Sequence, residues 1–315
     1  MRKVVRESLV VLAVTCTAIV VGVNYAIEHV LSYSPIRPHR CTAAEMVRFV
    51  PDLQSPAAFT ERWDNFDITV EDSIRLKGWF IPSLRQPAQG TIIVLHGIAS
   101  CRIAMLSIAR ACAQNGFNCL VYDSRANGES GGLNCTFGYY EKGDVLAYLD
   151  SALVRYPGCG PFGIFGDSFG AAVAIQALAA DKRLVCGIAQ SPFASLREVI
   201  HDYFRQMFLL PVDFIPDAAL KHSERIAHFS VDSVQPALDA RRVLQPTLII
   251  HGESDKKISS GYGRQVYENL ASPNKELYLI PAAGHTDLAA IGGPEYESRL
   301  LRFLQKHVRR PDPPL

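Results

Sequence analysis

The chain has 315 residues, 48% of them hydrophobic and 20% charged, enough to bury the core of one large domain. Its net charge is +1 and its basic residues occur only in short pairs, so it lacks the electrostatic surface of a nucleic-acid-binding protein. The eight Cys are scattered, with no C-x-x-C pair and no Cys/His group at zinc-ligand spacing. We therefore expect neither a nucleic-acid partner nor a metal site.

Residues 1–30 have the pattern of an export or anchor segment. Basic residues at 2, 3 and 6 precede a run, Leu9 to Val23, that is apolar on all sides. This pattern is typical of a signal peptide or of a single transmembrane signal-anchor helix with a cytoplasmic N-terminus. No small-x-small cleavage site follows, which favours the anchor. We predict that the rest of the chain lies on the non-cytoplasmic side, periplasmic or extracellular; the alternative is secretion after cleavage.

Residues 31–61 carry four Pro, at 35, 38, 51 and 56, and we predict a linker that packs loosely on the domain. The predicted domain covers residues 62–310. It opens with two segments, Phe66–Val70 and Ile74–Ile81, in which apolar and polar residues alternate. Such alternation predicts an antiparallel hairpin at a sheet edge.

Six short apolar runs follow, separated by segments of helix length. They are Thr91–Leu95, Cys119–Tyr122, Phe162–Phe165, Val185–Ala189, Thr247–Ile250 and Leu277–Ile280. Unbroken apolar strands are buried on both faces, which requires a mostly parallel sheet with helices on both sides. The fold class is therefore α/β.

The segment Gly166-Asp167-Ser168-Phe169-Gly170 has the form G-x-S-x-G and lies between a predicted strand and a predicted helix. A strand that turns into a helix this sharply needs Gly two residues before and after the tip, so that the two elements can pass closely. The tip residue, Ser168, then stands above the carboxyl edge of the sheet, where a nucleophilic serine works.

Two later loops supply partners for this serine. Asp255 follows the strand Thr247–Ile250, and His285 follows the last strand, so both fall at the same sheet edge as Ser168. A serine hydroxyl needs an imidazole to take its proton, and the imidazole needs a carboxylate to set its tautomer. We predict the triad Ser168, His285 and Asp255. Glu253 is the rival for the acid, and we interpret Asp287 as a loop residue.

His96-Gly97 follows the first parallel strand at this same edge. We predict that the backbone N–H groups of Ile98 and Phe169 form an oxyanion hole. His96 itself we interpret as a residue that shapes the loop.

Together these motifs resemble the α/β-hydrolase superfamily, over roughly residues 62–307. The segment 123–130 resembles the D-x-R-G-x-G-x-S loop of serine aminopeptidase-like and monoglyceride-lipase-like hydrolases, with Ala126 in place of the usual Gly. The segment 138–145 resembles membrane-associated relatives of the Bem46 and ABHD17 type. The resemblance implies serine hydrolysis without a cofactor and leaves the substrate open. We interpret Asp123 and Arg125 as an ion pair that shapes their loop.

We expect a serine esterase or thioesterase that acts on small or lipid-like acyl substrates, with a small helical cap at about residues 192–244. A peptidase or aminopeptidase is the alternative within enzymes. A non-catalytic binding protein on the same fold is a second alternative, although no triad residue or turn Gly is lost. A scaffold that docks a partner through Phe204–Leu210 is a third.

Overall fold

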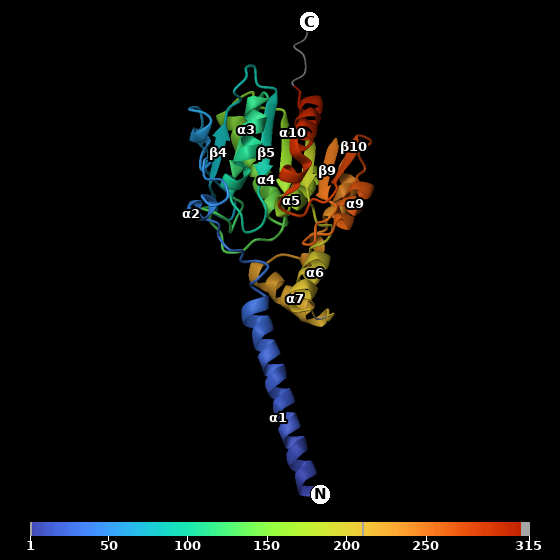
Figure 1. Cartoon of the computed structure of the whole chain (residues 1–315). Helices are drawn as coiled ribbons and strands as arrows, with labels where there is room; N and C mark the ends of the chain where they lie inside the picture. Colours follow the sequence, from blue (N-terminus) through green and yellow to red (C-terminus); the bar gives the residue numbers. More distant parts are fainter. Residues whose placement is uncertain (1, 210, 310–315) are drawn as a thin grey trace.

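The computed structural model describes residues 2–209 and 211–309. Leu210, the last residue of the predicted docking stretch, and residue 310, the predicted end of the domain, lie outside this range. A long helix, α1 (Arg2–Ala26), continues into η1 (Ile27–Leu31) and projects from a compact body (Figure 1). The helical stretch Val4–Leu31 is long and apolar enough to cross a membrane.

The body is built on an eight-stranded sheet with the order β1-β4-β6-β5-β7-β8-β9-β10. The strands from β6 onward in this order are parallel to one another, as predicted. Their bounds are β5 Gly90–Leu95, β6 Phe117–Tyr122, β7 Phe162–Asp167, β8 Leu184–Gln190, β9 Thr247–Gly252 and β10 Lys275–Ile280. Strand β10 is only partly buried because it forms one edge of the sheet.

The prediction of one hairpin over Phe66–Val70 and Ile74–Ile81 is correct only as far as Leu76. Strands β2 (Ile68–Thr69) and β3 (Arg75–Leu76) pair alone, whereas β4 (Gly78–Ile81) lies antiparallel between β6 and the edge strand β1 (Asp64–Asn65). The break falls at Lys77. Its N–H donates to Ser130 Oγ at 2.8 Å and its carbonyl accepts from the Asp123 N–H at 2.8 Å, so neither group continues the hairpin ladder.

Helices cover both faces of the sheet and bury an apolar layer on each (Figure 1). One face carries α4 (Glu141–Arg155), α5 (Phe169–Ala180) and α9 (Ser260–Asn269). The other carries α3 (Leu106–Gln114) and α10 (Leu288–His307). Short elements α2 (Ala43–Met46), η2 (Pro56–Ala58) and η3 (Arg102–Met105) complete the N-terminal half.

The segment between β8 and β9 forms the helical cap. Helices α6 (Leu196–Phe208) and α7 (Phe214–Ala227) project from the carboxyl edge of the sheet, on the side where α1 joins (Figure 1). Elements η4 (Val231–Ser233), α8 (Pro236–Asp239) and η5 (Ala240–Arg242) follow; α8 packs back against α5 and α9.

The segment 31–61 packs more tightly than the prediction of a loose linker. Ile36 is fully buried, and Cys41, Met46 and Leu53 join the apolar layer that includes α3. Arg40 donates hydrogen bonds to the carbonyls of residues 128, 130 and 132. The Pro residues therefore shape a segment held by buried apolar side chains, because Pro limits the backbone without preventing side-chain packing.

The predicted ion pair between Asp123 and Arg125 is also wrong. Asp123 pairs with Arg102, and its carboxylate accepts the Arg102 N–H at 2.6 Å. Arg125 forms a two-pronged pair with Asp144, at 2.6 and 2.8 Å, and reaches Asp72 at 2.8 Å. Each buried charge thus has a partner from another part of the chain, which offsets the cost of removing it from water.

The turn from β7 into α5 requires Gly on both sides of Ser168. A Cβ atom at Gly166 would overlap the backbone carbonyl of Gly170. A Cβ atom at Gly170 would lie 2.7 Å from the carbonyl oxygens of Leu95 and His96. Backbone atoms cannot swing aside as a flexible side chain can, so both positions need Gly.

We predict that Gly166→Ala lowers the free energy of unfolding by about 3 kcal/mol or more, because it forces two backbone segments apart. Gly143→Ala is the matched control: it lies in α4, is exposed, and has nothing within 4 Å of an added Cβ atom. It should stabilise the protein by about 0.5–1 kcal/mol. Urea unfolding of both variants measures this, and equal effects of the two substitutions would contradict the constraint.

Candidate active site

Ser168 stands at the tip of the β7–α5 turn with φ 52° and ψ −110°, a conformation that non-glycine residues rarely adopt. Its backbone N–H donates to the Gln190 carbonyl at 2.8 Å, which ties the turn to β8. Only 6% of the surface of Ser168 is exposed to solvent. The strained backbone, of the order of 1–3 kcal/mol, lifts the hydroxyl above the carboxyl edge of the sheet.

The structure brings together the three predicted residues Ser168, His285 and Asp255. The Nε2 atom of His285 lies 2.9 Å from Ser168 Oγ, and its Nδ1 atom lies 2.6 Å from Asp255 Oδ2. Their chain positions span more than a hundred residues, so the shared sheet edge is what makes them neighbours. An Nδ1–H that donates to the carboxylate leaves Nε2 free to accept the serine proton.

Asp255 is held in place by its own loop. Its Oδ1 accepts the N–H groups of Lys257 and Ile258, each at 2.9 Å. Its Oδ2 also lies 3.4 Å from Nε2 of the fully buried His251, which donates to the Ile258 carbonyl. Burial acts to raise the pKa of Asp255, but hydrogen bonds from His251, His285 and the Ile258 N–H hold it well below its usual range. The carboxylate therefore stays ionised.

The rival acid lies away from this arrangement. Glu253 has a side chain that is 43% exposed and pairs with Arg264 at 3.3 Å. Asp287, interpreted as a loop residue, accepts the Gly284 N–H at 2.6 Å and so shapes the loop that carries His285. The geometry favours Asp255 over both.

The loop after β5 is organised by the fully buried His96. Its Nε2 accepts the Ser124 N–H at 2.9 Å, so its Nδ1–H donates to the Gly97 carbonyl at 2.7 Å. Both ring nitrogens are thereby used, as a loop-shaping role requires. Ile98, the next residue along this loop, lines a cavity together with Ser168 and Phe169. The oxyanion hole formed by the N–H groups of Ile98 and Phe169 stays a prediction.

A chain of polar side chains that the sequence does not reveal lies behind Ser168. The Tyr296 hydroxyl donates to Gln190 Oε1 at 2.6 Å, and Gln190 Nε2 donates to Asp167 Oδ1 at 2.7 Å. Burial raises the pKa of Asp167, and the Gln190 hydrogen bond opposes this effect. These residues brace the turn from α10 and β8. Asp167 is a variable position of G-x-S-x-G, and no sequence signal links it to residues 190 and 296.

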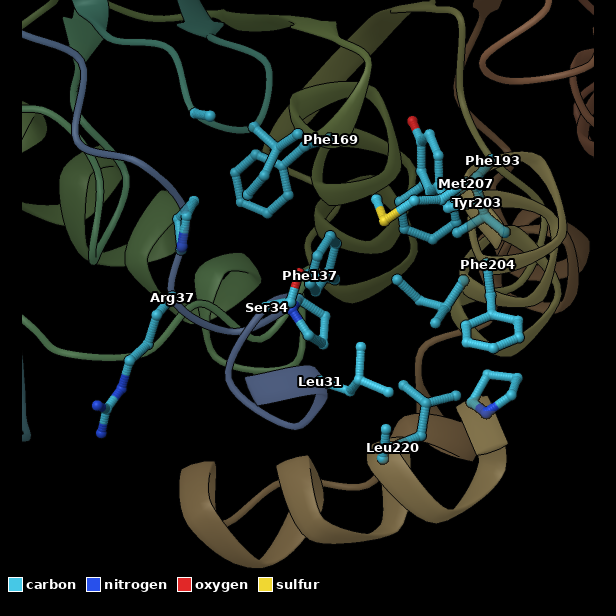
Figure 2. Close-up of a pocket in the computed structure, with 18 of the residues that line it drawn as sticks. Leu31, Ser34, Arg37, Phe137, Phe169, Phe193, Tyr203, Phe204, Met207 and Leu220 are labelled. Atoms are coloured by element: carbon cyan, nitrogen blue, oxygen red, sulfur yellow. The ribbon is translucent and has the colours of Figure 1, made fainter. Parts of the chain in front are cut away.

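Ser168 opens into an apolar cavity of about 480 Å³, within the range of small-molecule sites. Figure 2 shows aromatic side chains of Phe137, Phe169, Phe193 and Phe204 around it. Its wall is completed by Leu31, Ser34, Pro35 and other residues of the segment that follows α1. The sequence does not predict that this segment lines the cavity. Its Pro residues are typical of a linker, and no pattern in residues 31–39 indicates a pocket.

Within the described residues, no group of three or more His, Cys, Asp or Glu is arranged to hold a metal ion. The side chains near Ser168 that could in principle bind a metal are Asp255, His251 and His285. Their nitrogen and oxygen atoms form hydrogen bonds with one another, with Ser168 or with backbone groups, except for His251 Nδ1. The arrangement suits proton transfer at Ser168.

Comparison with known proteins supports hydrolase function. A family model described as serine aminopeptidase, S33, matches residues 86–235. The YqkD protein of Bacillus subtilis is 29% identical over 215 residues, which cover 67% of this chain and 68% of YqkD. The lysophosphatidylserine lipase ABHD12 of Rattus norvegicus is 26% identical over 292 residues, covering 79% of this chain and 67% of the lipase.

Among solved structures, the Pyrococcus furiosus esterase Pf2001 is similar with a TM-score of 0.67 and 28% identity. The match covers 81% of this chain and 96% of the esterase. The sheet order, the strand–turn–helix at Ser168 and these similarities agree with one another. Together they support the assignment of this chain to the α/β-hydrolase superfamily.

Proposed function

We propose that the protein is a serine hydrolase that cleaves carboxylic esters or thioesters through an acyl-Ser168 intermediate. The observation that carries this proposal is the hydrogen-bonded chain from Ser168 through His285 to Asp255, at the wall of an apolar cavity. No cofactor takes part in this chemistry.

In the proposed mechanism His285 takes the proton of Ser168 as its Oγ attacks the acyl carbon. The negative charge that develops on the carbonyl oxygen is held by the N–H groups of Ile98 and Phe169. His285 then gives its proton to the leaving alcohol or thiol. In the second half, His285 takes a proton from a water molecule as the water oxygen attacks the acyl carbon. The bond from that carbon to Ser168 Oγ then breaks, and His285 returns the proton to Oγ as the acid leaves. Asp255 orients His285 and stabilises its protonated form.

The cavity favours an acyl chain as the part of the substrate that it binds. Apolar side chains dominate its lining, and each CH₂ group moved out of water gains about 0.8 kcal/mol. The esterase and lipase among the similar proteins support the same substrate class.

A peptidase is the second candidate, favoured by the name of the matching family model. An aminopeptidase needs a carboxylate near the site to bind the substrate ammonium group, because a bare buried charge is costly. None of the described residues that line the cavity is Asp or Glu. The cap carboxylates at 213 and 217 pair instead with Arg205 and Arg197.

We further propose that α1 anchors the protein in a membrane with the hydrolase domain on the non-cytoplasmic side. The length and apolarity of Val4–Leu31 support the anchor, and the basic residues at positions 2, 3 and 6 support a cytoplasmic N-terminus.

Ser168→Ala should abolish labelling by a fluorophosphonate probe, because the probe reacts only with an activated serine oxygen. The substitution removes one atom and keeps the Gly pair, so thermal unfolding should match the wild type closely. Gel fluorescence of both proteins measures the effect. Undiminished labelling of Ser168→Ala would place the nucleophile elsewhere.

Asp255→Asn should lower kcat by about 10⁴-fold with little change in KM, a loss of the size seen when the matching acid is neutralised in other serine hydrolases. The amide no longer holds the imidazole proton on Nδ1. Glu253→Gln is the matched control, from the same loop, and should change kcat less than about threefold, since Glu253 lies outside the triad. Steady-state hydrolysis of a nitrophenyl ester tests both; a crippling Glu253→Gln would overturn the assignment of the acid.

Turnover should depend on the acyl group. We expect kcat/KM to rise with acyl length over the first few carbons and then to fall once the cavity is full. Aminoacyl amides should be poor substrates, because their ammonium group finds no carboxylate in the cavity wall. A panel of nitrophenyl esters and aminoacyl amides measures this. Faster turnover of the amides than of any ester would favour the peptidase.

A further inference from the structure

The cap ends in an exposed apolar tip, which we define as Met207, Phe208, Leu209 and Phe214. Their exposed fractions are 70%, 42%, 85% and 66%. The tip lies where α6 ends and α7 begins, and the flanking charges of Arg205 and Asp213 pair with each other at 2.7 Å. Soluble proteins seldom leave several large apolar side chains together in water, so this patch indicates a contact surface.

The tip lies on the side of the body from which α1 emerges (Figure 1). Helix α7 packs against η1, the end of the candidate membrane helix, and Ser223 Oγ donates to the Ser32 carbonyl at 2.6 Å. Both partners of that hydrogen bond are fully buried. The cap is therefore tied to the point where the apolar helix enters the body.

The cavity is walled by these same elements. Met207 and Phe208 of the tip and Leu31 of η1 all line it, and Figure 2 shows Leu31 and Met207 at its wall with Leu220 of α7. A lipid bilayer around α1 would thus meet both the tip and one wall of the cavity. The apolar surface that α1 exposes from Val4 onward points to that bilayer, rather than a second protein, as the occupant of the tip.

We propose that the tip inserts into the leaflet in which η1 ends, and that the cavity receives its substrate from that leaflet. The substrate class is then an ester of a membrane-resident amphiphile whose acyl chain enters the cavity between the tip and η1. This proposal rests on the proposed hydrolase function and deepens it.

The test uses the full chain in phosphatidylcholine vesicles. The variant Leu209→Asp/Phe214→Asp changes two tip residues that do not line the cavity. Its kcat/KM on a long-chain lysophosphatidylcholine in the bilayer should fall about tenfold or more, with no change on a water-soluble short-chain nitrophenyl ester. The control Leu133→Asp/Val154→Asp alters exposed apolar residues elsewhere, at 76% and 82% exposure, and should change neither. Equal losses on both substrates, or no loss, would overturn the proposal.

A second readout is independent of catalysis. A phospholipid with a photoreactive acyl chain should label the peptide that contains Leu209 and Phe214, and leave the peptide with Val154 unlabelled. Absence of label at the tip overturns the insertion whatever the activity. Label at the tip together with unchanged hydrolysis in Ser168→Ala would instead sustain the insertion and remove the proposed function.

A different observation concerns two cysteines. The Sγ atoms of Cys41 and Cys101 lie 2.9 Å apart, although 60 residues separate them in the chain. Both are buried, with 8% and 3% of their surface exposed, and both are free thiols in this structure. Cys41 follows the cavity-lining residues Pro38 and His39, and Cys101 precedes η3 in the loop that carries Ile98.

We infer that these two thiols form a disulfide in an oxidising compartment, which would clamp the cavity wall to the Ile98 loop. The oxidant is a disulfide compound. One cysteine thiolate attacks it and expels a thiol, and the second cysteine resolves the mixed disulfide and expels the other; two protons and two electrons leave the pair. Burial raises the pKa of both thiols, so exchange is slow once the domain has folded.

The full chain is refolded with oxidised and reduced glutathione, denatured, and alkylated without reductant. Peptide mass mapping should find residues 41 and 101 linked, and Cys186, which is buried on β8, alkylated. Refolding in dithiothreitol in place of glutathione should lower the Tm of the wild type and leave that of Cys41→Ser unchanged. Alkylation of both Cys41 and Cys101, or linkage of either to another cysteine, would overturn the inference.

Discussion

The close passage of two backbones at the β7–α5 turn is the constraint on which the site depends. Gly166 lies against Gly170, and Gly170 lies against the carbonyls that end β5. Only this contact lets α5 start directly above the sheet with Ser168 at its tip. The strain stored at Ser168 is borne by packing on both sides, including the polar chain from Tyr296 through Gln190 to Asp167.

Local patterns were sufficient to predict the parallel strands and the meeting of Ser168, His285 and Asp255. Each of these residues follows a buried apolar run, and parallel strands bring such positions to one edge. Pairings between side chains of distant segments could not be predicted. Arg102 for Asp123, Asp144 for Arg125, and Gln190 for Asp167 depend on three-dimensional proximity that no spacing encodes. The close packing of residues 31–61 could not be predicted because their buried side chains are sparse among Pro and polar residues.

The packing of residues 31–61 also bears on the proposed function. A linker would leave the apolar helix and the hydrolase as separate parts, whereas Leu31 and Ser34 form part of the cavity wall. The buried Ser32–Ser223 contact joins the helix end to the cap. In this arrangement the proposed anchor orients the cavity. The contact between the helix end and the cap then accounts both for the proposed substrate class and for the proposed membrane location.

The central claim is that acyl transfer passes through Ser168, and trapping the intermediate tests it most directly. The enzyme is mixed with excess nitrophenyl butyrate, quenched in acid during turnover, digested, and the peptides are weighed by mass spectrometry. After digestion with trypsin, the account predicts a butyryl group on the peptide 156–182 and, by fragmentation, on Ser168. Steady release of nitrophenol with the acyl group on another residue, or on none, would contradict it.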